Sequence, residues 1–190
     1  MIIDAADQRG HLPSVSESAE SLAALIAATQ HGDPDALGQL YGRYADLAYG
    51  AAYRILASTS DAEDVLQDVF VGLPEALRNY DERGRFDSWL KRVAIRAALM
   101  RVRSANRRRE ESIDAVTHEI RSGERDLVDR VAMRDTIRSL PDHLRVVFML
   151  KEVEGYSHVE IAELIGIKPN ASAARLFRAW KLLRNAARKS

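Results

Sequence analysis

Apolar residues recur at intervals of three and four residues from Leu22 almost to the end of the chain. They stand in long stretches rich in Ala, Leu, Arg and Glu, and no alternating run of β-branched residues interrupts them. This spacing lines the apolar side chains along one face of a helix, and such a face is buried against other helices. With 46% hydrophobic residues the chain can bury a core. We therefore predict an all-α fold.

Helix start signals support this prediction. Asp33 stands before Pro34, which fits a capping side chain followed by a first-turn proline, and Ser60 with Glu63 and Ser157 with Glu160 both fit a capping box. The predicted helices span residues 22–31, 34–57, 61–77, 87–103, 125–139, 142–153, 158–165 and 170–187.

Two segments lack helical periodicity and divide the chain. Residues 1–20 mix Asp, Ser, Glu, Gly and Pro, and are predicted to be a disordered N-terminal extension. Residues 104–124 carry charges of both signs with few large apolar residues, and are predicted to be a flexible linker. Two small helical domains remain, at 21–103 and 125–190, each near the lower size limit for folding alone.

Charge is segregated along the chain although its formal sum is zero. Residues 59–82 hold seven acidic side chains and one basic side chain, whereas residues 85–109 hold nine basic and one acidic. Residues 168–190 hold seven basic side chains and no acid. The sequence thus predicts one acidic surface, able to dock a basic protein, and two basic surfaces, able to neutralise phosphates.

The acidic segment places Asp64, Gln67 and Asp68 on one helix face, because residues three and four apart are neighbours on a helix. Asp61 lies one turn earlier. This face is a candidate protein-docking surface, although an ordinary solvated helix face would have the same pattern.

The first basic segment is helical as well. Arg92, Arg96 and Arg103 project in nearly one direction together with Trp89, and Arg85 precedes them. Guanidinium groups can hold phosphates, and an indole ring can stack on an unpaired base. The alternative is that Trp89 anchors the core and the arginines form a solvated face.

The C-terminal residues fit a helix-turn-helix. Ser157 caps a short helix, and the spacing of Ala162, Gly166 and Ile167 suits a close helix pair with a tight turn. The second helix would then present its N-terminal residues to base edges and phosphates. Its candidate DNA-contacting residues, together with Ser157, are Asn170, Ser172, Arg175, Arg178 and Lys181. Helical hairpins with glycine turns also occur in proteins that do not bind DNA.

Residues 61–70 (DAEDVLQDVF), residues 85–94 (RFDSWLKRVA) and residues 140–178 together resemble the extracytoplasmic-function class of bacterial RNA polymerase sigma factors. The resemblance implies that Asp61, Asp64, Gln67 and Asp68 bind the clamp coiled coil of the polymerase's largest subunit. It also implies that residues 85–103 hold the melted non-template strand, and that residues 170–181 read the upstream promoter element as duplex. The linker would run toward the RNA exit path, and the second domain would reach the polymerase flap.

The resemblance further implies an anti-sigma factor as inhibitor and a cytoplasmic location. The chain departs from the family at Arg96, where Asn is usual, and at Met100, where Asp is usual. The recognition helix reads NASAAR in residues 170–175, where the family often has GTVKSR. It therefore carries fewer base-reading groups.

Other functions receive less support. The five histidines are scattered and form no HExxH motif, and the sequence shows no GxSxG or glycine-rich phosphate loop. No enzyme activity, cofactor, metal site, membrane span or signal peptide is predicted. Without cysteine, disulfides and thiolate chemistry are excluded. A helix-turn-helix regulator that acts without polymerase, and a sigma-like protein adaptor, are the remaining alternatives.

Overall fold

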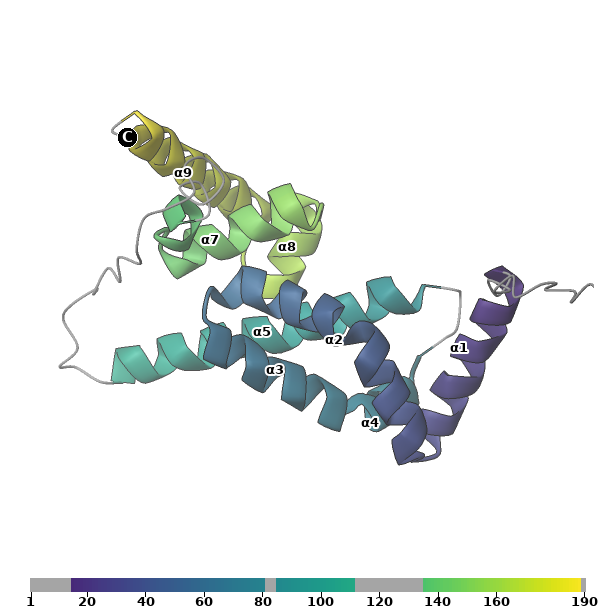
Figure 1. The fold of residues 1–190 in the computed structure, drawn as a ribbon. Coiled ribbons are helices and arrows are strands. Elements are labelled where there is room, and N and C mark those ends of the chain that lie inside the picture. Colours follow the sequence, from purple (N-terminus) through teal and green to yellow (C-terminus); the bar gives the residue numbers. More distant parts are fainter. Residues whose placement is uncertain (1–14, 81–84, 112–134, 189–190) are drawn as a thin grey trace, which may run out of the picture.

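The computed structural model describes residues 15–80, 85–111 and 135–188, and every regular element in these ranges is a helix. Within these ranges, the first helices of the chain form one bundle and the last ones form another (Figure 1). The first bundle comprises α1 (Val15–Gln30), α2 (Pro34–Leu56), α3 (Thr59–Val71), α4 (Leu73–Leu77) and α5 (Phe86–Glu111). The second comprises α7 (Asp142–Phe148), the π-helix η1 (Met149–Val153), α8 (His158–Ile165) and α9 (Pro169–Ala187). The predicted all-α fold is confirmed.

The first bundle is built around α2, which packs against α1, α3 and α5. Its most deeply buried large side chains include Leu40 and Ile55 of α2, Leu73 of α4, and Leu90 and Ile95 of α5. Leu90 and Ile95 are fully buried, whereas Arg92, Arg96 and Arg103 of the same helix are exposed. Burial of the apolar stripe therefore fixes which face of α5 meets solvent.

Local signals set several helix boundaries as predicted. Asp33 caps α2 by accepting hydrogen bonds from the backbone N–H groups of Asp35 and Ala36, at 2.8 and 3.2 Å. The capping box of Ser157 and Glu160 is present at α8. The predicted box at Ser60 and Glu63 is wrong, because α3 begins two residues earlier and Ser58 accepts from the Asp61 N–H instead.

The predicted helix at 61–77 is two helices. Gly72 ends α3 and begins α4, and Pro74 lies in the first turn of α4. Proline has no N–H to bond back to the carbonyl four residues earlier, so the helix cannot continue through it without a break. The predicted helix at 142–153 is continuous but widens into a π-helix over its last five residues.

Two segment boundaries differ from the prediction. Helix α1 begins at Val15, within the segment predicted to be a disordered extension, and α5 runs to Glu111, eight residues into the predicted linker. The weak apolar pattern there did not end the helix, because Ala and Arg are good helix formers. Most of the predicted helix at 125–139 lies outside the described residues, although residues 135–138 are helical.

The second bundle packs α9 across α7 and α8. The turn from α8 to α9 is made by Gly166, whose φ of 71° is left-handed, and both Gly166 and Ile167 donate their N–H to the Ala162 carbonyl. Leu150 and Ile161 are fully buried, as is Ala179 of α9. These contacts confirm the predicted helix-turn-helix.

Candidate protein and nucleic-acid interfaces

The acidic face of α3 consists of Asp64, Gln67 and Asp68, and all three are exposed. Val65, Val69 and Phe70 on the other side of α3 are buried in the first bundle. The apolar side therefore holds the helix so that its acidic face points outward.

Arg101 of α5 binds the N-terminal end of this face. Its Nε donates to Asp61 Oδ1 at 2.9 Å, and its Nη2 donates to Asp64 Oδ2. The hydrogen bond to Asp61, more than the charges nearby, raises the pKa of the Arg101 guanidinium. Arg101 belongs to the basic segment at residues 85–109, and its contact with Asp61 leaves no signal in local spacing because the two residues are 40 positions apart.

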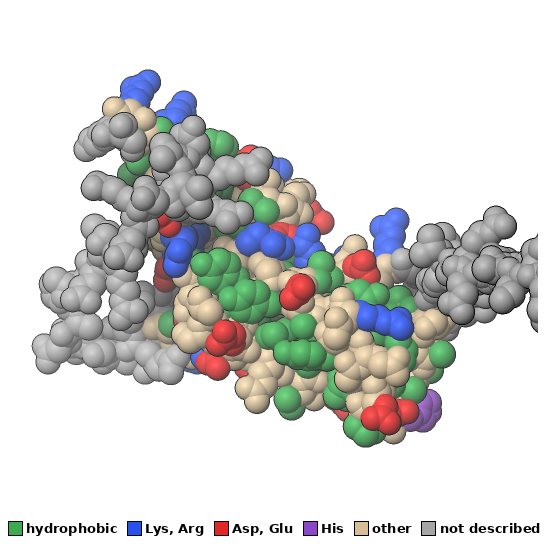
Figure 2. All heavy atoms as spheres, in the orientation of Figure 1, with side chains coloured by type: hydrophobic (Ala, Val, Ile, Leu, Met, Phe, Trp, Pro, Cys, Tyr) green, Lys and Arg blue, Asp and Glu red, His purple; other side chains and the backbone are tan. Residues whose placement is uncertain are grey.

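The structure adds an apolar residue to the acidic face. Val71 lies seven positions after Asp64, hence on the same side of α3, and is 74% exposed. Spacing alone could have identified it. Figure 2 shows hydrophobic side chains at the surface over α2 and α3, with acidic side chains among them.

The basic face of α5 carries Arg92, Arg96 and Arg103, all exposed, and Arg85 is exposed just before the helix. Met100 lies along the same side of α5 and is 67% exposed. The predicted clustering of these arginines on one face agrees with their exposure.

Trp89 is partly buried in an aromatic cluster. Its ring centroid lies 4.9 Å from that of Tyr80 and 5.7 Å from that of Phe86. Such pairs stabilise a fold by about 0.5–1.5 kcal/mol beyond burial alone. Trp89 therefore anchors the start of α5 while keeping part of its ring at the surface.

The outward side of the recognition helix α9 presents Asn170, Arg178 and Lys181, and Arg175 is half-buried. Phe177 lies between them and is 66% exposed. His143 of α7 is close to Arg175 and Arg178. Burial, and then repulsion from these two arginines, lowers the pKa of the His143 ring.

Two predicted DNA-contacting residues have structural roles here. Ser172 is fully buried, and its Oγ lies 2.9 Å from His158 Nδ1, a contact that joins α9 to α8. Burial leaves Ser172 no surface for a base, so it positions the recognition helix. Ser157 is exposed, but its hydroxyl accepts from the Glu160 N–H as the cap of α8.

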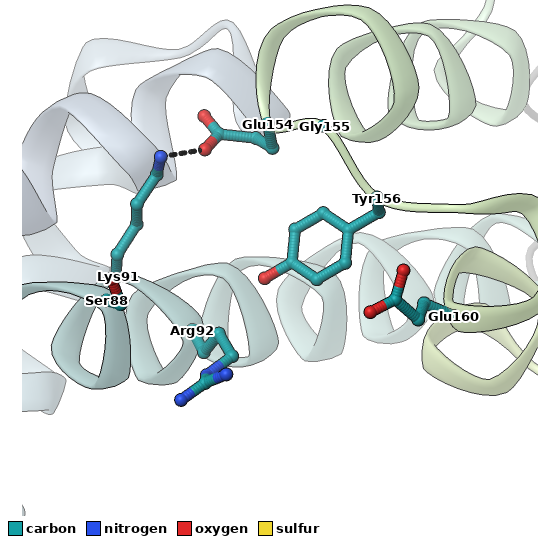
Figure 3. Close-up of a pocket in the computed structure, with 7 residues that line it drawn as sticks. All are labelled: Ser88, Lys91, Arg92, Glu154, Gly155, Tyr156 and Glu160. Carbon is teal, nitrogen blue, oxygen red and sulfur yellow. Dashed lines mark ion pairs between the residues drawn. The ribbon is translucent and has the colours of Figure 1, made fainter. Parts of the chain in front are cut away.

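A charged seam joins the two bundles. Glu154, at the end of η1, inserts its carboxylate between Arg54 of α2 and Lys91 of α5, with oxygen–nitrogen distances of 2.6 and 2.5 Å. The Glu154 side chain is 1% exposed. Figure 3 shows the Lys91–Glu154 pair at one side of a small cleft, about 220 Å³ in volume, whose other walls include Arg92, Tyr156 and Glu160.

Two arginines complete the seam by bonding to helix ends. Arg145 of α7, which is buried, donates to the carbonyls of Ile55 and Leu56 at the C-terminal end of α2, at 3.5 and 3.2 Å. Arg103 of α5 donates to the Leu164 carbonyl near the end of α8. A cation is favourable at a helix C-terminus, where carbonyl groups have no partner within the helix.

Comparison with known proteins identifies both bundles. Residues 40–108 match the family model of Sigma-70 region 2, and residues 130–183 match that of Sigma-70, region 4. The chain is 31% identical over 169 residues to the RNA polymerase sigma-H factor of Pseudomonas aeruginosa, a match that covers 82% of this chain and 88% of that protein. The chain belongs to the RNA polymerase sigma factors.

A second relative is named for the extracytoplasmic-function class, in agreement with the resemblance seen in the sequence. This sigma factor is 28% identical over 176 residues to the ECF RNA polymerase sigma-E factor of Haemophilus influenzae, covering 85% of this chain and 93% of the relative. A DNA-binding regulator that acts without polymerase would lack a match to Sigma-70 region 2. That alternative is therefore not favoured.

The fold has a counterpart among solved structures. The sigma factor RpoE of Bartonella quintana, in complex with the anti-sigma factor NepR, matches with a TM-score of 0.53 and 15% identity. The match covers 92% of this chain and 98% of that chain. The two-bundle arrangement of this sigma factor is thus a known fold.

Metal-binding clusters and membrane-spanning helices are absent from the described part of the sigma factor. Within that part, no group of three His, Asp or Glu side chains could hold a metal ion, and no helix is long and apolar enough to cross a membrane.

Proposed function

We propose that this sigma factor binds core RNA polymerase through the acidic face of α3, with Asp64, Gln67 and Asp68 against the clamp coiled coil. The observation that carries this proposal is the separation of charge within one bundle. The acids lie on α3 and the exposed arginines on α5, and both helices pack on α2. Polymerase and DNA can then be held at a fixed spacing without competing for one surface.

The basic face of α5 holds the melted non-template strand. Arg85, Arg92, Arg96 and Arg103 supply phosphate contacts, which bring affinity without sequence selection. The exposed part of Trp89 supports stacking on an unpaired base. Arg96 and Met100 differ from the residues usual in the family, and they lie on this face, so they set its base preference.

Helix α9 reads the upstream element as duplex. Asn170 can pair with adenine in the major groove, while Arg178 and Lys181 reach phosphates or guanine. Few polar groups remain on this helix for base reading. The upstream element therefore contributes less selectivity here than the downstream one.

An anti-sigma factor covers these surfaces when the sigma factor is inactive. The Bartonella quintana relative in its complex with NepR supports such a partner. Because the protein acts on polymerase and DNA, it functions in the cytoplasm. It contributes binding energy and no chemical step of its own.

Charge reversal of the acidic face tests the docking proposal. In the variant with Asp64→Lys and Asp68→Lys, affinity for core polymerase should fall by roughly tenfold or more, because charge pairs across an interface become repulsive. The control carries Asp46→Lys and Glu75→Lys, which change the same charge on exposed residues of α2 and α4. Core binding can be measured by fluorescence anisotropy and promoter-specific initiation by run-off transcription. Equal affinity of the two variants would refute the assigned face.

A further inference from the structure

We infer that Arg54 and Lys91 form a phosphate-binding site for promoter DNA. Glu154 occupies this site as an internal competitor while the two bundles pack against each other, which is the closed arrangement; in the open arrangement the bundles are apart. The inference rests on the proposed binding of the melted strand by α5. It extends that surface to α2 and gives the closed arrangement a regulatory role.

The first argument is the makeup of the site. One carboxylate lies between two cations, so the local charge stays positive after pairing. Arg54 and Lys91 come from the first bundle and Glu154 from the second. A DNA phosphate offers the same negative charge and the same kind of acceptor oxygens, which guanidinium and ammonium groups bind well.

The second argument is burial. Glu154 is 1% exposed, whereas Arg54 and Lys91 are each 33% exposed. When the bundles separate, Glu154 regains water and the cations are already partly hydrated. A buried ion pair gains little over its hydrated state, because desolvation offsets most of the attraction. The contact can therefore exchange for another anion without a large loss of free energy.

The third argument is continuity with the basic face. Lys91 precedes Arg92 on α5, and both line the cleft opposite Glu154, Tyr156 and Glu160 (Figure 3). Arg92 and Arg96 lie near enough to Tyr156 to oppose the rise in its pKa that burial causes. The segment from η1 to α8 therefore lies against one edge of the face that would hold DNA.

The rest of the seam is equally suited to exchange. Arg145 and Arg103 bond to carbonyls at helix ends, and water can replace such charged hydrogen bonds at a net cost of about 1.5–3 kcal/mol each. Closed and open arrangements can then lie close in free energy. A strand that binds only the open form shifts the population toward it.

Glu154→Gln tests the competition, with Glu152→Gln as matched control. The control removes the same charge from an exposed residue of η1. Since the chain has no cysteine, Gln39→Cys and Asn185→Cys provide unique dye sites on α2 and α9. Glu154→Gln should lengthen the distance measured by single-molecule energy transfer. It should also bind a fluorescent oligothymidylate strand roughly five- to tenfold more tightly, because apparent affinity scales with the open fraction. Circular dichroism verifies that each variant is folded.

Lys91→Gln separates the phosphate site from simple packing. It should also open the chain, but it removes a phosphate contact, so strand affinity should not rise. The slope of log affinity against log salt should decrease by about 0.7, the value for one phosphate contact on a single strand. The inference would be overturned if Glu154→Gln lengthened the dye-to-dye distance no more than Glu152→Gln does. It would also be overturned if the salt slope of strand affinity in Lys91→Gln equalled that of the wild type.

These measurements need no polymerase. A wild-type chain that fails to direct transcription would count against the proposed function, whereas unchanged distance and strand affinity in Glu154→Gln would count against the competitor role of Glu154. The two failures are therefore distinguishable.

Discussion

Partners far along the chain decide what several charged or polar residues do in this sigma factor. Glu154 pairs with an arginine 100 residues away, and Arg101 binds carboxylates 37 and 40 residues away. Ser172 lies near the N-terminal end of α9, the part of a recognition helix that meets DNA, yet it is buried against His158. A side chain's chemistry sets what it can bind, and burial sets whether it is available.

Ser172→Ala should separate stability from DNA reading. Loss of the hydrogen bond to His158 should lower the free energy of unfolding by about 1 kcal/mol, measured by urea denaturation. The choice of upstream sequence should not change, because the side chain has no exposed surface. A changed preference in selection from random duplexes would contradict the positioning role.

Arg178→Ala should have the opposite profile. Arg178 is exposed on α9, so its loss should leave stability within about 0.5 kcal/mol of wild type. Duplex binding should weaken, and the slope of log affinity against log salt should fall by about 1 if Arg178 contacts a phosphate. Titration of duplex binding at several salt concentrations measures both.

His143 should make stability depend on pH. Its pKa is lowered in the folded chain, so below the unfolded value of about 6.5 the unfolded chain binds more protons. Stability is therefore fully present above that value and is lost as the pH falls toward the folded pKa. Thermal melts at about pH 7.5 and 5.5 should show a larger loss for wild type than for His143→Gln.

At the scale of elements, short-range hydrogen bonds set the helix boundaries. Asp33 and Ser157 cap helices through bonds to residues two or three positions ahead, and Gly166 turns the chain between α8 and α9. Ser58 caps α3 in place of Ser60, which adds Thr59 and Ser60 to the helix.

Two glycine substitutions should have opposite signs. Gly166 has a φ of 71°, and a Cβ added there would meet no atom within 4 Å, so Gly166→Ala should destabilise by about 1 kcal/mol through backbone strain alone. Gly38 lies inside α2 with equal space around it, and Gly38→Ala should stabilise by about 0.5–1 kcal/mol. Urea denaturation of both variants checks this, and a stable Gly166→Ala protein would contradict the left-handed turn.

At the scale of the whole molecule, the charged seam joins the two bundles. The buried apolar residues of the two bundles form one contiguous cluster, and the contacts between the bundles also include ion pairs and hydrogen bonds to helix ends. Polar contacts of this kind can be hydrated when they separate. The fold thus combines rigid surfaces with a junction that can open.

Arg145→Met should uncouple the two bundles. Arg145 is buried and bonds both to Asp142 and to α2 carbonyls, so its removal should cost about 2 kcal/mol and divide one unfolding transition into two. Calorimetry can detect this change. Arg184→Met, an exposed arginine of α9, is the control and should keep the wild-type profile. A single unshifted transition in Arg145→Met would mean that the seam does not couple the bundles.

The sequence determined the all-α class, most helix positions, the helix-turn-helix and the outward face of α3. These depend on residues within a few positions of one another, and helical periodicity and capping are properties of that range. Only the tertiary structure decided that Arg101 neutralises part of the acidic face, that Ser172 is buried, and that Glu154 lies between Arg54 and Lys91. Each depends on residues far apart in the chain meeting, which packing brings about and local spacing does not encode.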